Sequence, residues 1–313
     1  MMSRVILTAL ALSLFCTNLV EAAPRKKIQI FILAGQSNME GHGTITSNKE
    51  HNNGQGSLEY LVKQDETAKQ YEHTINPDGS WAKRSDVWIE YLGRKGELSV
   101  GYGAREHLFG PELQFGHVVG NYFKEQVLII KTAWGGKSLA GDFRPPSSGG
   151  KVGPFYTEMV NHVKQVLADL GSHFPEYRGQ GYEIAGFGWH QGWNDGLSHD
   201  TVAEYESNLV NLINDLRKAF NTPEMPVVIA NSGFGGSAQK IDRRLGIIAA
   251  QLNVAKREEF SDSVFTVETR PFFRPPEVSP SRQGYHWNHN AETHFLIGDH
   301  MGRGILKLIS AAN

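Results

Sequence analysis

The sequence predicts an α/β fold in which a central parallel sheet carries helices on both faces. Two observations support this fold. Five short apolar runs have the length and composition of strands that are buried on both sides. Longer segments with helical periodicity separate these runs, and strands that alternate with helices favour parallel pairing, since each crossover helix returns the chain to the same end of the sheet.

The elements follow one another in a regular order along the chain. The predicted strands are Ile28–Ala34, Val127–Ile130, Ile184–Trp189, Val227–Ala230 and Val264–Val267. The predicted helices are Pro111–Phe123, which opens with proline at a first-turn position, Phe155–Leu170, Thr201–Phe220, Ser237–Glu259 and Ala291–Ile309. Residues 44–110 are rich in Gly, Asn, His and Lys, and we expect an irregular insertion that covers the sheet edge and helps to build a substrate cleft.

Length and charge limit the classes of protein that the chain can represent. It has 313 residues, 40% of them hydrophobic, which is enough for one large domain with a well-filled core. No linker divides it, so we expect residues 23–313 to form a single domain. The formal net charge of −2 gives no electrostatic reason to expect a nucleic-acid partner. The sequence leaves the oligomeric state open.

The N-terminus has the pattern of a secretory signal peptide over residues 1–22. Arg4 precedes the apolar run Val5–Phe15, and small residues around Ala22 form a cleavage site. The run is shorter than the ~20 residues of a membrane span, so we expect no stable membrane insertion and a secreted or periplasmic protein. The only cysteine, Cys16, lies in this segment, which excludes a disulfide or a cysteine-bound metal in the mature chain.

Polar and glycine-rich segments follow the predicted strands, at the edge where open parallel sheets bind ligands. These segments are Gly35–Asn38, Lys131–Ser138, His190–Asp195, Asn231–Gly233 and, before the last helix, Tyr285–Asn290. One edge of the sheet therefore gathers a serine, a glycine pair, an asparagine and histidines. Such a set contains the components of an acyl-transfer site.

Each of these components has a defined role in acyl transfer. Ser37 is the candidate nucleophile, and histidine is the base that activates serine near neutral pH. The oxyanion needs preorganised donors, for which the N–H groups of Ser37 and of Gly136 (or Gly135) are candidates. The side-chain amide of Asn194 is a third donor. Met39 stands where G-x-S-x-G would have its second glycine, so a strained nucleophile elbow is not indicated.

These segments resemble the conserved blocks of the SGNH hydrolases, in the sialate O-acetylesterase-like branch that includes carbohydrate esterase family six. Gly35–Asn38 is similar to the first block in its G-Q-S-N variant, and Gly135-Gly136 to the second. Gly192–Asp195 matches the third-block pattern G-x-N-D, and Gly110–Gly116 looks like the G-P-E segment of this branch. The final helix and the histidine before it resemble the fifth block, so the resemblance covers residues 28–310.

The resemblance implies a fold and an activity. The fold would be a flavodoxin-like three-layer α/β/α sandwich, the SGNH hydrolase fold. Ser37 would be the nucleophile, with its own N–H, a glycine N–H and Asn194 as the oxyanion hole. The protein would be a carbohydrate O-acetylesterase of the acetylxylan or sialate type, with an acetylated carbohydrate as its partner and with neither a cofactor nor a metal.

Two histidines compete for the role of base, because the fifth block normally reads D-x-x-H. By spacing alone His289 would be the base, with His286 where the aspartate belongs. The histidine of this block is usually followed by an aromatic or large apolar residue, which favours His286, and Gln283 then occupies the aspartate position. Either way the usual aspartate is missing. The orienting group would be a backbone carbonyl, a carboxylate such as Glu268 or Glu292, or absent in a Ser–His dyad.

Residues beside the catalytic candidates are predicted to contact the substrate. Three tryptophans adjoin them and offer faces on which a sugar ring would stack. The predicted substrate-binding residues are Gln36, Trp134, Gly135, Gln191, Trp193 and Trp287. Arg144, Arg270 and Arg274 lie in loops near strand ends, where they are either solvated or placed to meet an anionic sugar.

Two other functions fit the same residues. An SGNH lipase or thioesterase would use the same nucleophile but needs a more apolar cleft than the polar residues 44–110 suggest. A non-catalytic carbohydrate-binding protein would explain the missing aspartate. A serine-directed covalent probe separates this last alternative from an esterase, since a binding module should not label at Ser37.

Overall fold

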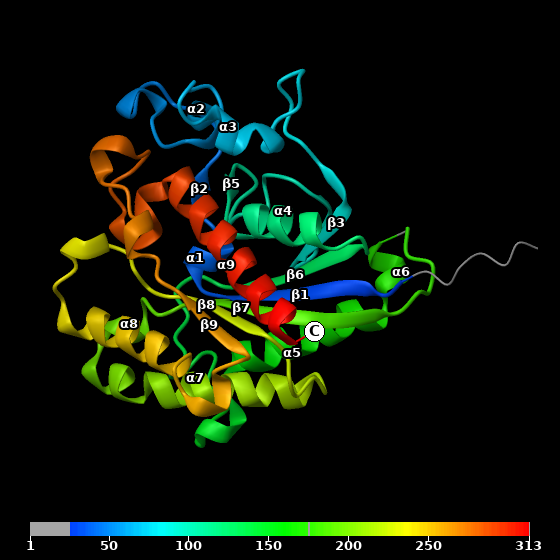
Figure 1. Ribbon diagram of the computed structural model, residues 1–313. Helices are drawn as coiled ribbons and strands as arrows, with labels where there is room; N and C mark the ends of the chain where they lie inside the picture. Colours follow the sequence, from blue (N-terminus) through cyan, green and yellow to red (C-terminus); the bar gives the residue numbers. More distant parts are fainter. Residues whose placement is uncertain (1–25, 175, 313) are drawn as a thin grey trace, which may run out of the picture.

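The computed structural model describes residues 26–174 and 176–312, and its centre is a seven-stranded sheet (Figure 1). In spatial order the strands are β4 (Arg94–Leu98), β3 (Arg84–Tyr91), β6 (Val127–Ala133), β1 (Ile28–Gly35), β7 (Tyr182–His190), β8 (Val227–Ala230) and β9 (Val264–Val267). All neighbours pair in parallel except β3 and β4, which form an antiparallel hairpin. The predicted signal peptide lies outside the described residues.

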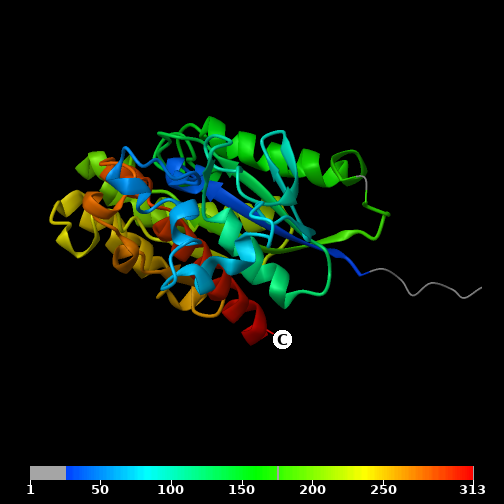
Figure 2. The ribbon, with the colours of Figure 1, turned by 90° about the horizontal axis from the view of Figure 1, so that it is seen from above.

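Helices cover both faces of the sheet, so the predicted three-layer α/β/α sandwich is confirmed. One face carries α5 (Pro154–Ala168), α7 (His199–Ala219) and α8 (Asp242–Val254), and the other carries α4 (Glu112–Tyr122) and α9 (Ala291–Ala312). Figure 2 shows the sheet between α5, in green, and α9, in red. A further single turn, α6 (Leu170–His173), follows α5.

The alternation of side chains along β1 explains why both faces are apolar. Ile30 and Ile32 pack into the core under α5 and α7, whereas Phe31 and Leu33 pack into the core under α4 and α9. All four side chains are fully buried. A strand in this position needs apolar residues on both faces, which is the pattern that its sequence predicts.

Residues 44–110 differ from the irregular insertion that we expected. Their segment 84–98 forms β3 and β4 and extends the central sheet beside β6. These strands could not be recognised in the sequence, because the charged Glu90 interrupts the apolar run. In the fold, Glu90 is fully buried. Its carboxylate accepts hydrogen bonds from the His162 ring and the Gly93 N–H group.

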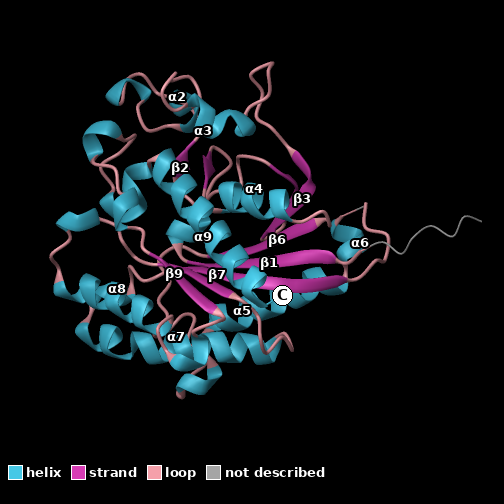
Figure 3. Cartoon of the chain, in the orientation of Figure 1, coloured by secondary structure: helices cyan, strands magenta, loops and turns pink. Residues whose placement is uncertain are grey.

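The rest of this segment does form a cap of short elements. Strand β2 (Gly43–Thr44) pairs antiparallel with β5 (Leu108–Phe109), and α2 (Leu58–Leu61) and α3 (Ala68–Tyr71) are single turns. Figure 3 shows α2 and α3 together with their loops at one end of the molecule, beside the start of α9. Across residues 26–174 and 176–312, no helix combines the length and the apolar character that a membrane crossing requires.

Candidate active site

Ser37 stands where β1 ends, as the first residue of the one-turn helix α1 (Ser37–Glu40). The chain turns there through Gly35, whose φ of 154° belongs to a region that side-chain-bearing residues rarely adopt. A Cβ atom on Gly35 would lie 2.2 Å from the backbone oxygen of His190. Glycine is therefore needed for β1 and β7 to approach each other directly beneath the serine.

Gln36 ties the serine loop to the loop that follows β7. Its side chain is 2% exposed, and its Oε1 accepts hydrogen bonds from the N–H groups of Gly192 (3.1 Å) and Asn194 (3.4 Å) and from Gln191 Nε2 (3.3 Å). Its Nε2 donates to Asn194 Oδ1 at 3.3 Å. With both ends engaged by protein, Gln36 supports the site rather than contacting substrate as we expected.

Gln191 has the same supporting role, contrary to the expectation that it contacts substrate. Its amide is buried and donates to Asp195 Oδ2 at 2.6 Å and to the Lys137 carbonyl at 3.0 Å. The Asp195 carboxylate also accepts the N–H groups of Leu139 and Ala140, each at 2.8 Å. Burial raises the pKa of Asp195, and these donors counteract the shift. The loops after β6 and β7 are thus held together by one buried carboxylate.

The Asn194 amide is held in a single orientation beside the glycine pair. Its Nδ2 donates to the Gly136 carbonyl at 2.7 Å, while its Oδ1 accepts from Gln36. The second N–H bond of Nδ2 has no protein partner among the described residues and remains available to a ligand. A Cβ atom on Gly135 would lie 3.8 Å from Ser37 Cβ, so the glycine pair adjoins the serine. The predicted oxyanion donors therefore do come together.

The two glycines differ in their conformational requirement. Gly136 has a φ of 69°, and a Cβ atom there would meet nothing within 4 Å. Glycine is favoured at this position by the left-handed backbone rather than by lack of space. Gly135 is close to Glu40, since its Cβ would lie 3.0 Å from Glu40 Oε2. Burial raises the pKa of the Glu40 carboxyl, and a hydrogen bond from the Gly135 backbone opposes this shift. Of the two glycine N–H groups considered as oxyanion donors, that of Gly136 has no backbone partner among the described residues, whereas that of Gly135 bonds to Glu40.

A buried lysine, which the sequence analysis did not single out, anchors the serine helix. Lys131 Nζ donates to the Glu112 carboxylate at 2.7 Å and to the carbonyls of Glu40 (2.6 Å) and Tyr102 (2.7 Å). Lys131 and Glu112 are both fully buried, and desolvation lowers the pKa of Lys131. Glu112 belongs to the G-P-E segment, whose place in the fold is thereby explained. The sequence signal that could have indicated this buried ion pair is a lysine that directly follows the apolar run Val127–Ile130.

Three histidines gather next to the serine helix, and one of them was not predicted. His286 and His289 lie in the segment before α9, and His42 follows α1. The rings of His42 and His286 stack with their centroids 3.7 Å apart and their planes 12° apart, and the His289 ring is 5.3 Å from that of His42. Asn38 Nδ2 donates to the Tyr285 carbonyl at 3.1 Å, which holds the His286 segment against the serine helix.

The local environment keeps these rings uncharged. Burial, together with the neighbouring histidines, lowers the pKa of His286 to about 4 and that of His42 to about 3. Burial also lowers the pKa of His289. A neutral ring can accept a proton from a serine. Among the described residues, His42 Nε2 and His286 Nδ1 are buried without a hydrogen-bond partner. A serine–histidine hydrogen bond often forms only when substrate is bound.

The two carboxylates considered as the orienting group pair with arginines rather than with His286 or His289. Glu268 pairs with Arg270 (2.9 and 2.6 Å), and Glu292 pairs with Arg274 (2.6 and 2.8 Å). Nδ1 of His286 is buried without a protein hydrogen bond among the described residues. These observations favour the dyad alternative over a carboxylate-oriented triad.

The predicted tryptophan platforms differ in accessibility. Trp287 is 0% exposed and packs in the core, so its predicted stacking on a sugar ring is wrong. Its left-handed backbone (φ 54°) turns the side chain inward. Trp193 is half-buried, and the Arg244 guanidinium covers one of its faces at 3.9 Å. Trp134 is also half-buried and packs beside Phe155.

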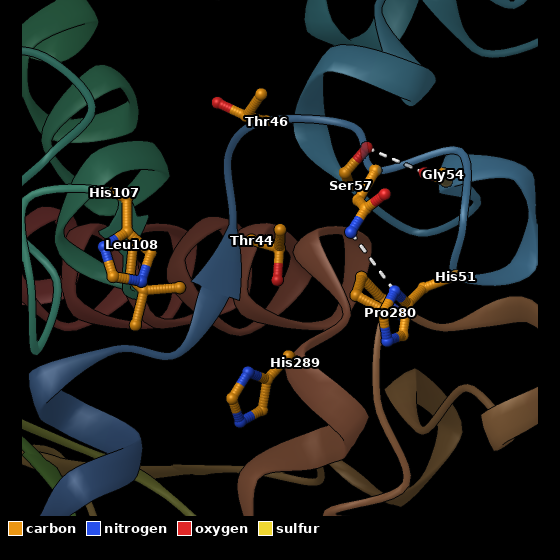
Figure 4. A pocket seen from close by; sticks show the side chains of 10 residues that line it. Thr44, Thr46, His51, Gly54, Ser57, His107, Leu108, Pro280 and His289 are labelled. Carbon is orange, nitrogen blue, oxygen red and sulfur yellow. Dashed lines mark hydrogen bonds between the residues drawn. The ribbon is translucent and has the colours of Figure 1, made fainter.

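A cavity of about 260 Å³ opens beside the histidines (Figure 4). Seven of its ten lining residues carry a hydroxyl, amide or imidazole group, although more of the exposed wall surface is apolar than polar. The lining residues are Thr44, Thr46, Asn48, His51, Gly54, Ser57, His107, Leu108, Pro280 and His289. In Figure 4, His107 and His51 lie on opposite sides, with His289 below Thr44. Most of this wall belongs to residues 44–108, and it contains no lysine, arginine or carboxylate.

The mostly parallel sheet, the serine at the end of β1 and the hydrogen-bonded Asn194 amide define a protein with the SGNH hydrolase fold. The chain matches the family of carbohydrate esterases described as sialic acid-specific acetylesterases over residues 27–294. It therefore belongs to this family of carbohydrate esterases.

Individual relatives are distant. A probable carbohydrate esterase of Arabidopsis thaliana is 25% identical over 221 residues, which are 70% of this chain and 75% of the plant protein. The X-ray structure of that protein superimposes with a TM-score of 0.59 at 18% identity, covering 90% of this chain and 98% of the other.

Two further structures share the fold at lower identity. The crystal structure of NanS has a TM-score of 0.56 at 11% identity over 92% of this chain and 99% of its own. A carbohydrate acetylesterase from Xanthomonas citri has a TM-score of 0.53 at 11% identity over 88% of this chain and 57% of its own. At these identities the superpositions support the fold alone.

Proposed function

We propose that this protein is a secreted carbohydrate O-acetylesterase with Ser37 as nucleophile and His286 as base. The observation that carries the proposal is the Asn194 amide, which Gln36 and Gly136 hold in one orientation beside Ser37. A donor fixed before substrate arrives is what oxyanion stabilisation requires. Stacking of His286 on His42 restricts the base in a similar way.

The reaction would proceed through an acetyl-enzyme. His286 takes the Ser37 hydroxyl proton as Oγ attacks the acetyl carbonyl carbon, and the oxyanion receives hydrogen bonds from the Ser37 and Gly136 N–H groups and from Asn194. The ester bond breaks, and the sugar oxygen leaves with the proton from His286. Water then attacks the acetyl-enzyme and gives its proton to His286, after which acetate departs and Ser37 regains its hydrogen.

We infer that the sugar is neutral, of the acetylxylan type rather than the sialate type. The cavity wall carries hydroxyl and amide groups, which suit sugar hydroxyls, and no side chain of permanent charge. The three arginines considered for an anionic sugar have carboxylate partners in the protein: Arg144 with Glu204, Arg270 with Glu268, and Arg274 with Glu292. A sugar carboxylate would have to compete for them.

Arg105 is the cation that makes this inference testable. It is exposed and lies two residues before His107 of the cavity wall. Its charge contributes to the lowered pKa of His42, after burial, the neighbouring histidines and Lys131. We expect acetate release from acetylated xylo-oligosaccharides to exceed release from O-acetylated sialic acid, in wild type and in Arg105→Gln alike. A preference for the sialate ester that Arg105→Gln abolishes would contradict a neutral substrate.

The choice of base is tested on the same acetylated xylo-oligosaccharides. His286→Ala should reduce kcat by about 10²–10⁴, the usual contribution of general base catalysis, whereas His289→Ala should retain most of it. A collapse in His289→Ala with an active His286→Ala would reverse the assignment. Thermal unfolding of both variants controls for loss of fold.

Secretion is tested separately by expressing the full chain in a bacterial host with two membranes. The signal-peptide pattern of residues 1–22 predicts a mature N-terminus near Ala23. Intact mass of the exported protein should show removal of these residues. A full-length cytoplasmic product would contradict the proposed secretion.

A further inference from the structure

The three histidines near Ser37 (His42, His286 and His289, the histidine cluster) have a property that the esterase mechanism does not use. One ring nitrogen from each lies within 4.8 Å of the others. Two of the rings belong to a single segment before α9, and the third comes from the loop after α1. Sets of imidazole groups that converge on one point are common ligands of transition-metal ions.

The hydrogen bonds around the cluster leave lone pairs free for a metal. Nε2 of His42 and Nδ1 of His286 are buried without a protein hydrogen bond among the described residues. Nε2 of His289 lies 2.8 Å from Gln283 Oε1, so this nitrogen carries the proton and Nδ1 keeps its lone pair. A ligand histidine that donates its other N–H to an oxygen is the common outer-shell arrangement of metal sites.

We propose that the histidine cluster binds one divalent transition-metal ion, such as Zn²⁺, and that this binding inhibits the esterase. The inhibitory part rests on the proposed role of His286 as base, whereas the binding part does not. A neutral imidazole has one ring-nitrogen lone pair, so a metal bound to it would leave His286 unable to accept the Ser37 proton. The site would thus act as an inhibitory metal site rather than as a cofactor site.

Metal coordination would require the histidine rings to move. With Zn–N bonds of about 2.0–2.1 Å and tetrahedral angles, ligand nitrogens lie roughly 3.4 Å apart. Nitrogens now up to 4.8 Å apart must therefore close, and the stacked rings of His42 and His286 must tilt so that both lone pairs meet at one point. The stacked arrangement and the metal-bound arrangement exclude each other. Imidazole ligands without a carboxylate favour Zn²⁺, Cu²⁺ or Ni²⁺ over Mg²⁺ and Ca²⁺.

Titration calorimetry of the mature protein with Zn²⁺ at pH 8, where histidine is normally uncharged, tests the binding part. We expect one Zn²⁺ per chain for wild type and no comparable binding of Mg²⁺. His42→Ala and His289→Ala should each weaken Zn²⁺ binding at least tenfold. His51→Ala, which alters a histidine of the same cavity outside the cluster, should bind as wild type does. Co²⁺ absorption at visible wavelengths should report the same site.

Two outcomes would overturn the inference, and both are separable from failure of the proposed function. Absence of Zn²⁺ binding to wild type, or equal binding by wild type and the folded variants His42→Ala and His289→Ala, would remove the site and leave the esterase untouched. Stoichiometric binding without loss of acetate release would refute inhibition alone. If wild type lacks esterase activity with every substrate, calorimetry still decides whether the metal binds.

Discussion

Replacing Lys131 by methionine should destabilise the protein strongly. The change keeps an unbranched stem as far as the ε position but removes the ammonium group. The fully buried Glu112 carboxylate then retains only the Gly110 N–H group, at 2.8 Å, among these partners. The carbonyls of Glu40 and Tyr102 also lose their donor. Removal of one partner from a buried ion pair typically costs about 3–5 kcal/mol, because the other charge stays in a medium that solvates it poorly.

Urea and thermal unfolding measure this loss. At about 2–4 °C per kcal/mol for a domain of this size, the melting temperature should fall by roughly 6–20 °C. A Lys131→Met, Glu112→Leu double variant should recover part of the loss, because no unpaired charge remains. If Lys131→Met alone unfolds within about 1 kcal/mol of wild type, the pair does not exist as described or is solvated in solution.

Two further predictions concern the site and the response to acid. Gln36→Leu should lower kcat by about 10²–10³ with a smaller change in KM, because Asn194 loses the contact that fixes its amide; unchanged steady-state kinetics would contradict this. Burial lowers the pKa of His117 to about 3 and of His190 to about 4. The unfolded chain therefore binds protons first, so stability is complete above pH 6.5 and falls as the pH drops toward 4. Urea unfolding at pH 7.5, 6 and 5 tests this, and a constant free energy of unfolding would refute it.

The sheet could be predicted where both faces of a strand are apolar. The predicted bounds Val227–Ala230 and Val264–Val267 are those of β8 and β9. β3 could not be predicted, since Glu90 looks like a solvent-exposed charge until its partner His162 is known to lie 72 residues away in sequence. A contact between residues so far apart in sequence leaves no periodic pattern of apolar and polar residues.

Some residues of the candidate site could likewise be predicted from the sequence, and others could not. Ser37, Gly136 and Asn194 could be placed together because parallel strands deliver their carboxyl ends to one edge. His42 could not, because it lies in a loop whose sequence has no period and it reaches the site through its contact with His286. The burial of Trp287 depends on three successive left-handed residues, a backbone conformation that the sequence does not indicate.

Covalent labelling shows whether Ser37 is the nucleophile on which the proposed mechanism depends. Mature wild type and Ser37→Ala are treated with a fluorophosphonate probe, and the modified peptide is identified by mass spectrometry. We expect one adduct per wild-type chain, located on Ser37, and no adduct on the variant. Labelling of Ser37→Ala at the wild-type rate, or an unlabelled wild type that still releases acetate, would contradict this role of Ser37.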